Sequence, residues 1–285
     1  MARILLPEDY GTIAMLAIFI AISQSFVDSG FSNALIRKVD RTETDYSTVF
    51  YFNIVVGLFF YFILFFTSPF IAGFYSTPVL EPLTKVLGLS LLFNSLCVVQ
   101  QARLTINLNF KTQAVISLLS VLTSGTLGLW MAYSSYGVWA LAVQTVLQAA
   151  LRMILFWGLA KWKPTRKFSK VSFKEMFGFG SKILASGLLD TIYKNIYTII
   201  IGKCFSSTVL GYYSRADQFA QFPSSNLTGI MQRVTFPVLS AIQNEDERLR
   251  INYRKFLRLS AFIIFPLMIG LSALAAPFIE LLLTD

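Results

Sequence analysis

Five charged residues lie inside otherwise apolar stretches of the C-terminal half of the chain: Lys182, Asp190, Lys194, Arg215 and Asp217. A charge near the centre of a bilayer costs about 2.5–3.5 kcal/mol on insertion scales, so such residues face protein or water rather than lipid. Asp190 and Lys194 are four residues apart and can neutralise each other on a helix. Arg215 and Asp217 are two apart and do not share a face, so we expect Arg215 to be the unpaired cation.

Uncharged polar residues extend these two stretches into stripes at helical spacing. The stripes add Gly187, Thr191 and Thr198 to the first stretch, and Ser214, Gln218, Gln221, Ser225 and Gln232 to the second. Two such stripes predict a hydrophilic cavity for a large polar anion, although interhelical ion pairs and hydrogen bonds would give the same pattern. Asn94, Gln100, Gln101, Gln144 and Gln148 are weaker candidates for the opposite wall. Lys182 lies near the end of its stretch, where it can reach the membrane interface.

Other kinds of chemistry find little support in the sequence. The chain has no His, which removes the usual general base and the commonest metal ligand. Cys97 and Cys204 are too few and too far apart for a metal cluster or a redox motif, and no Gly-rich phosphate loop is present. We therefore expect no catalytic residues, no metal and no cofactor. The acidic groups Glu245–Glu247 and Asp40, Glu43 and Asp45 are interpreted as solvated charges beside Arg residues.

The composition predicts an all-α, polytopic membrane protein. Of the 285 residues, 55% are hydrophobic, 15% aromatic and only 14% charged, which is more apolar surface than one soluble core can bury. About twenty apolar residues cross a bilayer as a helix, and the chain divides into about eight such stretches. They cover residues 11–28, 48–68, 83–101, 113–133, 138–160, 178–202, 208–231 and 256–277. Pro69 is expected to close the second, and residues 134–137 to form a tight turn after the fourth.

The distribution of Lys and Arg predicts the orientation. The net charge of +9 resides mainly in the linkers after the first, third, fifth and seventh stretches, whereas the intervening linkers carry almost no basic residues. Cytoplasmic loops retain positive charge, so these four linkers are expected to be cytoplasmic, with both chain ends on the outer side. The basic residues lie between apolar runs rather than on a soluble basic face, so we expect contact with membrane lipid and no nucleic acid.

An internal repeat relates the two ends of the chain. Leu5–Gly11 corresponds to Phe205–Gly211, 200 residues later, and each leads into an apolar stretch. Pro69-Phe70-Ile71 likewise recurs as Pro277-Phe278-Ile279. The two copies run in the same direction across the membrane, as in parallel-repeat transporters. If so, a helix is expected before Met1 and further spans after Asp285.

Two motifs carry a resemblance to a known family. They are Ala2–Gly11, followed by a span and Phe26–Arg37, and Leu210–Ala216 continuing to Phe236–Ser240. With these motifs the chain resembles the bacterial polysaccharide or O-antigen flippases of the multidrug/oligosaccharidyl-lipid/polysaccharide exporter superfamily. The resemblance implies a two-lobe, parallel-repeat transporter of twelve to fourteen helices, of which this chain is similar to helices two to nine. The lobes would be residues 1–160 and 177–285, joined by the basic cytoplasmic linker 161–176.

The resemblance also implies a function in the bacterial inner (plasma) membrane. The family moves undecaprenyl-pyrophosphate-linked oligosaccharide between leaflets for O-antigen, capsule or exopolysaccharide synthesis, alongside glycan polymerase and chain-length machinery. Arg215, Lys194, Lys182 and Gln218 would then contact substrate, with Asp190 and Asp217 as sites for a coupling ion. A cation-coupled small-molecule exporter of the same superfamily is the alternative, and the cationic bias of the stripes argues against it. A membrane-embedded glycan polymerase would need a large outer loop.

Overall fold

The computed structural model describes residues 4–28, 30–38, 40–221, 239 and 245–283, and all regular structure among them is helical. The chain forms two compact units that meet between Gly211 and Tyr212. The first unit contains α1 (Pro7–Asp28), α2 (Phe31–Arg37), α3 (Glu43–Tyr75), α4 (Leu80–Ser95), α5 (Val98–Ile106), α6 (Phe110–Tyr133), α7 (Val138–Ala160) and α8 (Lys170–Cys204). In the second unit lie α10 (Asp246–Ala273) and α11 (Ala275–Leu283). A further helical stretch covers residues 207–221.

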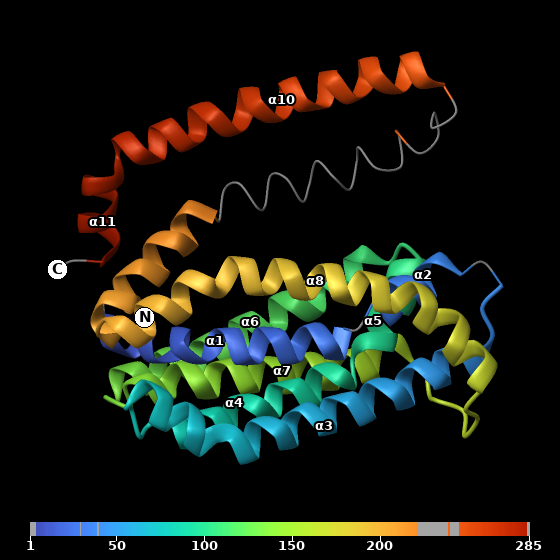
Figure 1. Ribbon diagram of the computed structural model, residues 1–285, viewed down its shortest axis with the longest axis horizontal. Helices are drawn as coiled ribbons and strands as arrows, with labels where there is room; N and C mark the ends of the chain where they lie inside the picture. Colours follow the sequence, from blue (N-terminus) through green and yellow to red (C-terminus); the bar gives the residue numbers. More distant parts are fainter. Residues whose placement is uncertain (1–3, 29, 39, 222–238, 240–244, 284–285) are drawn as a thin grey trace. The chain divides into compact units, whose positions relative to one another are not determined.

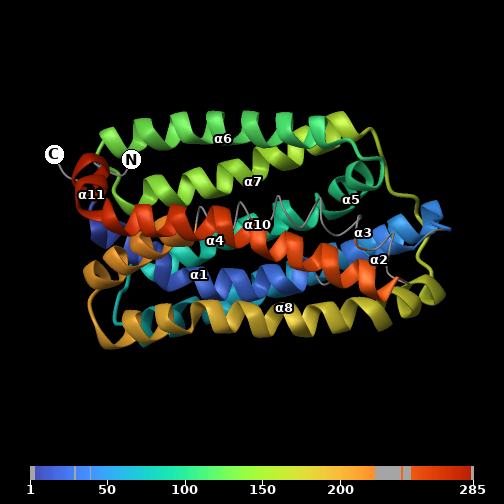
Figure 2. The ribbon, with the colours of Figure 1, turned by 90° about the horizontal axis from the view of Figure 1, so that it is seen from above.

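The long helices of the first unit lie side by side as a bundle (Figures 1 and 2). α1 packs against α3, α4, α7 and α8, while α4 also packs against α3 and α7. α6 contacts α7 on the side of the bundle away from α8 (Figure 2). α1 is therefore the central helix, and side chains on several of its faces meet other helices.

The helices confirm the expected all-α membrane protein. Among the described residues, five helical stretches are long and apolar enough to cross a membrane, and α4 with α5 makes a sixth if this bent pair is one span. The two helices of that pair meet at 41°. α8 is long enough, at 35 residues, but it does not share this hydropathy because it carries the polar stripe. The expected span 208–231 begins in the helix 207–221, and its remainder lies outside the described residues.

Proline 69 does not close the second span, contrary to the sequence-based expectation. It lies inside α3, which continues to Tyr75. Proline has no N–H to donate to the carbonyl of Phe65, one turn earlier. The Ser68 hydroxyl donates to that carbonyl at 2.7 Å instead. The helix can therefore pass through the proline because its neighbour satisfies the freed acceptor.

The tight turn expected between the fourth and fifth spans is confirmed. α6 ends at Tyr133 and α7 begins at Val138. Ser135 and Gly137 within the turn have φ angles of 62° and 54°, in the left-handed region. The reversal therefore takes four residues, and it brings α6 and α7 together as neighbours.

All basic linkers of the first unit lie at one end of the bundle. This end holds the end of α1, the start of α3, the end of α7 and the start of α8 (Figure 2). Ser135 lies at the opposite end, in the turn between α6 and α7. The basic linkers of this unit therefore share one end, as the charge pattern requires. That this end is cytoplasmic stays a prediction, and it is called the inner end below.

Polar contacts bind the linker after α7 to the start of α3 at the inner end. Trp162 Nε1 donates to the Glu43 carboxylate at 2.7 Å. The Thr165 hydroxyl is 2.9 Å from that of Ser47, and the Ser169 N–H donates to the Thr48 hydroxyl at 3.0 Å. This linker is therefore anchored along its length rather than loosely tethered.

Asp45 is not a solvated charge, which corrects the sequence-based interpretation, whereas Glu43 is exposed as expected. Asp45 is 1% exposed and forms a capping box with Thr42 at the start of α3. Lys38 bridges Asp45 at 3.2 Å and Glu175 of α8 at 2.8 Å. The hydrogen bond to the Glu175 carboxylate raises the pKa of Lys38, because it favours the charged ammonium. The acids fix the junction of α2, α3 and α8.

Replacing Lys38 should destabilise the protein. Lys38→Met leaves the buried Asp45 carboxylate without its cation, and we expect a loss of about 1–3 kcal/mol. Lys85→Met is the matched control, because its ion pair with Glu81 is more exposed and should matter by less than about 1 kcal/mol. The unfolding midpoints of both purified variants in detergent measure the difference. Equal midpoints would contradict the anchoring role.

The orientation can be tested with single cysteines. In a background without Cys97 and Cys204, cysteines are placed at Ser135 and Lys167, which are both exposed and lie at opposite ends of the unit. A membrane-impermeant thiol reagent added to intact cells should label only the cysteine at position 135. Labelling at position 167 would reverse the orientation.

Candidate functional site

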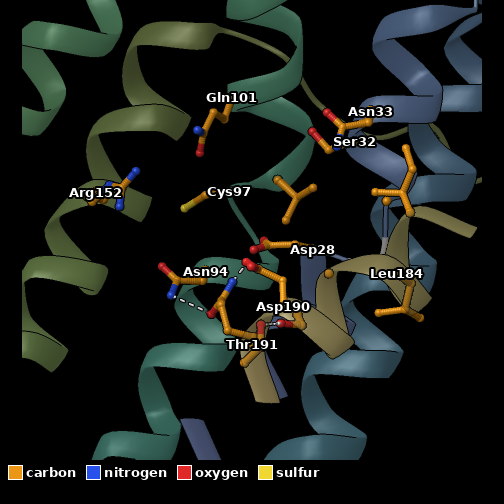
Figure 3. Close-up of a pocket in the computed structure, with 16 residues that line it drawn as sticks. Asp28, Ser32, Asn33, Asn94, Cys97, Gln101, Arg152, Leu184, Asp190 and Thr191 are labelled. Carbon is orange, nitrogen blue, oxygen red and sulfur yellow. Dashed lines mark hydrogen bonds between the residues drawn. The ribbon is translucent and has the colours of Figure 1, made fainter. Parts of the chain in front are cut away.

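A polar cavity of about 640 Å³ lies among the inner halves of the helices of the first unit. Six helices, α1, α2, α4, α5, α7 and α8, and the bends beside them contribute to its wall (Figure 3). The lining residues are Gln24, Ser25, Asp28, Gly30, Ser32, Asn33, Asn94, Cys97, Val98, Gln101, Arg152, Ile183, Leu184, Gly187, Asp190 and Thr191. Most carry oxygen or nitrogen in their side chains, so the cavity can hold water within the bundle.

The elbow between α1 and α2 shapes one wall of the cavity. Gly30 has φ 65°, a left-handed conformation that glycine adopts without strain. A Cβ at Gly30 would lie 2.4 Å from the backbone carbonyl oxygen of Gly180 in α8. The next residue, Phe31, is buried and packs on Phe52 and Phe173, from α3 and α8. The elbow thus sets the end of α1 directly against α8.

Hydrogen bonds connect the polar side chains across the cavity wall. Asn94 Nδ2 donates to Gln24 Oε1 at 3.0 Å, and Gln24 Nε2 donates to Asp28 Oδ1 at 3.0 Å (Figure 3). On the α8 side, the hydroxyls of Ser25 and Thr191 are 3.1 Å apart. These bonds orient the Asp28 carboxylate toward the cavity and hold α1 to both α4 and α8.

Arg152 brings a cation to the cavity from α7. The side chain is half-buried, and in Figure 3 it stands across the cavity from Asp28. Within the described part of the chain, its guanidinium forms no ion pair and no hydrogen bond. A guanidinium presents several N–H donors in one plane and suits bidentate binding of phosphate or carboxylate. Arg152 is thus available to an anionic ligand.

A second cavity of about 430 Å³ adjoins the first and shares Gln24, Asn94 and Arg152 with it. Its other lining residues come from α1, α4 and α7, and many of them are apolar. They are Ile13, Leu16, Ala17, Ile20, Ala21, Leu87, Ser90, Thr145, Gln148 and Ala149. Arg152 therefore lies where a polar and a more apolar space meet.

Comparison with known proteins identifies the family. A family described as "Polysaccharide biosynthesis protein" matches residues 1–285, the entire chain. The chain belongs to this family. It is a multi-pass membrane protein of a bacterial inner (plasma) membrane. The resemblance carried by the two sequence motifs is thereby confirmed.

Several curated proteins are similar to the chain over most of its length. The teichuronic acid biosynthesis protein TuaB of Bacillus subtilis (strain 168) is 32% identical over 260 residues, 90% of this chain and 54% of TuaB. The lipopolysaccharide biosynthesis protein WzxC of Escherichia coli (strain K12) is 26% identical over 99% of this chain and 58% of its own. The succinoglycan biosynthesis transport protein ExoT of Rhizobium meliloti (strain 1021) is 25% identical over 97% of this chain and 56% of the length of ExoT. The chain thus spans between half and three-fifths of the length of these relatives. No solved structure matches it significantly.

The structure brings one charged residue of the expected stripes into the cavity of this family member. Asp190 lines the cavity, and its ion pair with Lys194 is confirmed at 2.7 Å. Lys182 is exposed and is not among the lining residues. Of the residues proposed for the opposite wall, Asn94 and Gln101 line the cavity, whereas Gln100 is fully buried.

The expectation that Arg215 is unpaired is wrong. Its guanidinium donates to Gln218 Oε1 at 2.8 Å, one turn along the same helix. Asp217 accepts a hydrogen bond from Gln221 at 2.6 Å. These four residues belong to the second unit, and the roles of Arg215 and Gln218 in substrate binding and of Asp217 in ion binding stay predictions.

Sequence reasoning missed Arg152, Asp28 and Gln24. Arg152 carried a usable signal, because it is a lone charge inside an apolar span and such charges face cavities or partners. Asp28 lies at the end of its span, where a charge seems ordinary until the cavity that it lines is known. The expected cationic bias is also wrong for this cavity, since Arg152 faces the acids Asp28 and Asp190.

The elbow should not tolerate any side chain at Gly30. Gly30→Ala places a Cβ against the Gly180 carbonyl and forces alanine into the left-handed region, which alone costs about 1–2 kcal/mol. Gly178→Ala, in α8 and with open space around the new methyl group, is the control. We expect a lower unfolding midpoint for the first variant only, and a similar midpoint for both would contradict the close contact.

Proposed function

We propose that the protein is a flippase for lipid-linked oligosaccharide, carried on undecaprenyl pyrophosphate, across the inner membrane for O-antigen, capsule or exopolysaccharide synthesis. The observation that carries this proposal is the polar cavity with Arg152 in its wall. Glycan hydroxyls need water or polar side chains when they leave the aqueous phase, and the cavity lining supplies polar side chains. A diphosphate needs a cation, and a guanidinium matches its geometry.

The printed names of the relatives support a role in surface glycan synthesis. They refer to teichuronic acid, lipopolysaccharide and succinoglycan, and ExoT is named as a transport protein. These glycans differ, so the relatives support the class of substrate rather than one sugar sequence. In this proposal the protein moves its substrate and has no enzymatic activity. It works beside a glycan polymerase and chain-length machinery.

The arrangement of the cavity suggests separate tasks for its residues. Arg152 binds the diphosphate through charge-assisted hydrogen bonds. Asn94, Gln24 and Asn33 present amides to the first sugars, and the prenyl chain stays in lipid or apolar surroundings. Lys194, Lys182, Arg215 and Gln218 remain candidates for further substrate contacts, and Asp190 and Asp217 for a coupling ion. Lys194 first has to leave Asp190, to which it is bound here.

The test replaces Arg152 in a strain whose own gene is deleted. We expect Arg152→Ala to lower surface glycan about ten- to a hundredfold, because charge-assisted hydrogen bonds contribute about 1.5–3 kcal/mol. Arg152→Lys should retain part of the export, since the charge survives without the planar donor set. Arg166→Ala, in the exposed inner linker, is the control and should export normally.

Protein abundance and the lipid-linked intermediate are measured in the same cells. Loss of surface glycan with accumulation of the intermediate at normal abundance supports a block in transfer between leaflets. Normal glycan from Arg152→Ala at normal abundance contradicts the proposed role of Arg152.

A cation-coupled exporter is the second candidate, and the two acids in the cavity favour it. Asp28 and Asp190 both line the space, so it can bind a cation as well as an anion. Asp28→Asn keeps the shape and the hydrogen-bonding capacity of the side chain but removes the charge. Complete loss of function from Asp28→Asn, together with normal glycan from Arg152→Ala, would favour this candidate.

A further inference from the structure

The start of α1 and the start of the helix 207–221 cross with no side chain between them. A Cβ built at Gly11 would lie 1.7 Å from the Ser207 carbonyl oxygen. A Cβ built at Gly211 would lie 1.8 Å from the Pro7 carbonyl oxygen. Real Cβ atoms are never found at such distances, so both positions require glycine. Here the two backbones are in direct contact, and we call this contact the glycine crossing.

The glycine crossing is reciprocal, and its two halves are related by the internal repeat. Gly11 and Gly211 are 200 residues apart, and so are the carbonyl groups that they contact, on Pro7 and Ser207. Gly11 thus contacts Ser207, which is the repeat counterpart of Pro7, four residues before Gly11. In the same way, Gly211 contacts Pro7, which is the counterpart of Ser207, four residues before Gly211. This is the pattern of a contact on a local twofold axis, where one surface meets a second copy of itself. The two repeats therefore meet through equivalent points.

Close packing surrounds the crossing at the outer end of the first unit. A Cβ at Gly202 of α8 would lie 3.0 Å from Tyr75, 3.2 Å from Leu210 and 3.3 Å from Met15. Leu210 and Met15 are buried, with exposures of 0% and 2%. Lys203 donates to the carbonyl of Phe74 and lies over the ring of the same residue, with its Nζ 4.6 Å from the ring centroid. The ends of α3 and α8 thus close around the crossing.

The cavity lies toward the other end of the same helices. Gln24 follows Gly11 by 13 residues of α1, which is about 20 Å of helix. On α8, the cavity residue Thr191 precedes Gly202 by 11 residues, about 16 Å of helix. The polar cavity thus lies toward the inner end of α1 and α8, and the tightly packed contact of these helices with the helix 207–221 lies toward their outer end.

We propose that the glycine crossing is the outer gate of the transport pathway and is closed in this conformation. Two helices without side chains at their contact exclude water by the approach of their backbones alone. At the crossing itself no side chain stands between the helices, and beside it the buried Leu210 leaves its packing against α8 when they separate. Opening of the cavity to the outer side then requires α1 and the helix 207–221 to separate at this point. The proposal rests on the proposed function, because a transporter of this kind opens its cavity to one side of the membrane at a time, but it does not depend on which substrate is carried.

The test measures whether the cavity can be reached from outside. A cysteine replaces Thr191 in a background with Cys97→Ala and Cys204→Ser, in the intact gene product. An impermeant maleimide is added to whole cells, and the initial labelling rate is measured. Gly11→Ala and Gly211→Ala each keep the backbones apart, so each should raise this rate at least fivefold. The labelling rate of the double variant should be close to that of each single variant, because both changes act on one contact.

Matched controls use glycines that face open space. Gly125→Ala in α6 and Gly158→Ala in α7 add the same methyl group where nothing lies within 4 Å. Their labelling rates should equal that of the parent protein. Unchanged labelling in the Gly11 and Gly211 variants at normal abundance overturns the proposal, and so does an equal rise in the controls. Because labelling needs no substrate, a wrong proposal for the glycan would leave this result intact.

A second measurement applies where the alanine variants fail to accumulate. Cysteines replace Glu8 and Thr208, which follow the contact residues Pro7 and Ser207 in the two repeats. A short, reducible, impermeant bismaleimide joins them before the label is added. Joining should abolish labelling at residue 191, as detected by the mass of the intact protein, and reduction should restore it. Undiminished labelling of the joined protein overturns the gate.

Discussion

A polar group inside a bilayer can bond only to protein or to water that the protein admits, and this constraint organises the first unit. α8 carries too many polar residues to lie alone in lipid, and it packs along α1 and the elbow that follows it. Its polar face then meets Ser25 and Asp28, and the cavity forms where these faces do not fill the space between them. The same constraint acts on single atoms, as where Ser68 satisfies the carbonyl that Pro69 cannot reach.

Glycine has two distinct roles in building this arrangement. At Gly30 the backbone turns with a positive φ, which ends α1 and directs α2 across the start of α8. At Gly11 and Gly211 the backbones are helical, and the absence of a side chain permits contact between helices. Gly30 permits a backbone conformation, whereas Gly11 and Gly211 permit close approach of two helices. Together they determine where α1 touches the elements that follow the inner linker.

Much of the fold could be predicted from the sequence, because the bilayer imposes strong and local rules. Long apolar stretches and the turn before Val138 can be read from short windows, and so can the Asp190–Lys194 pair, which needs only helical spacing. The failures share a cause, which is that the deciding partner is distant in sequence or unusual. Asp45 looked solvated because the pattern did not show that Lys38 would bind it together with Glu175. Arg152 was overlooked because its importance depends on α1, α5 and α8 meeting around it.

The anchored inner linker limits how α8 can move. Residues 162–169 bond to the first two turns of α3 through Glu43, Ser47 and Thr48, and Lys38 joins Glu175 to Asp45 just beyond them. Sliding of α8 along the membrane normal would break all of these bonds at once, whereas tilting about its inner end would preserve most of them. The linker thus acts as a hinge at the inner end of α8. Because α8 is 35 residues long, a small rotation about this hinge displaces its outer end by many ångströms.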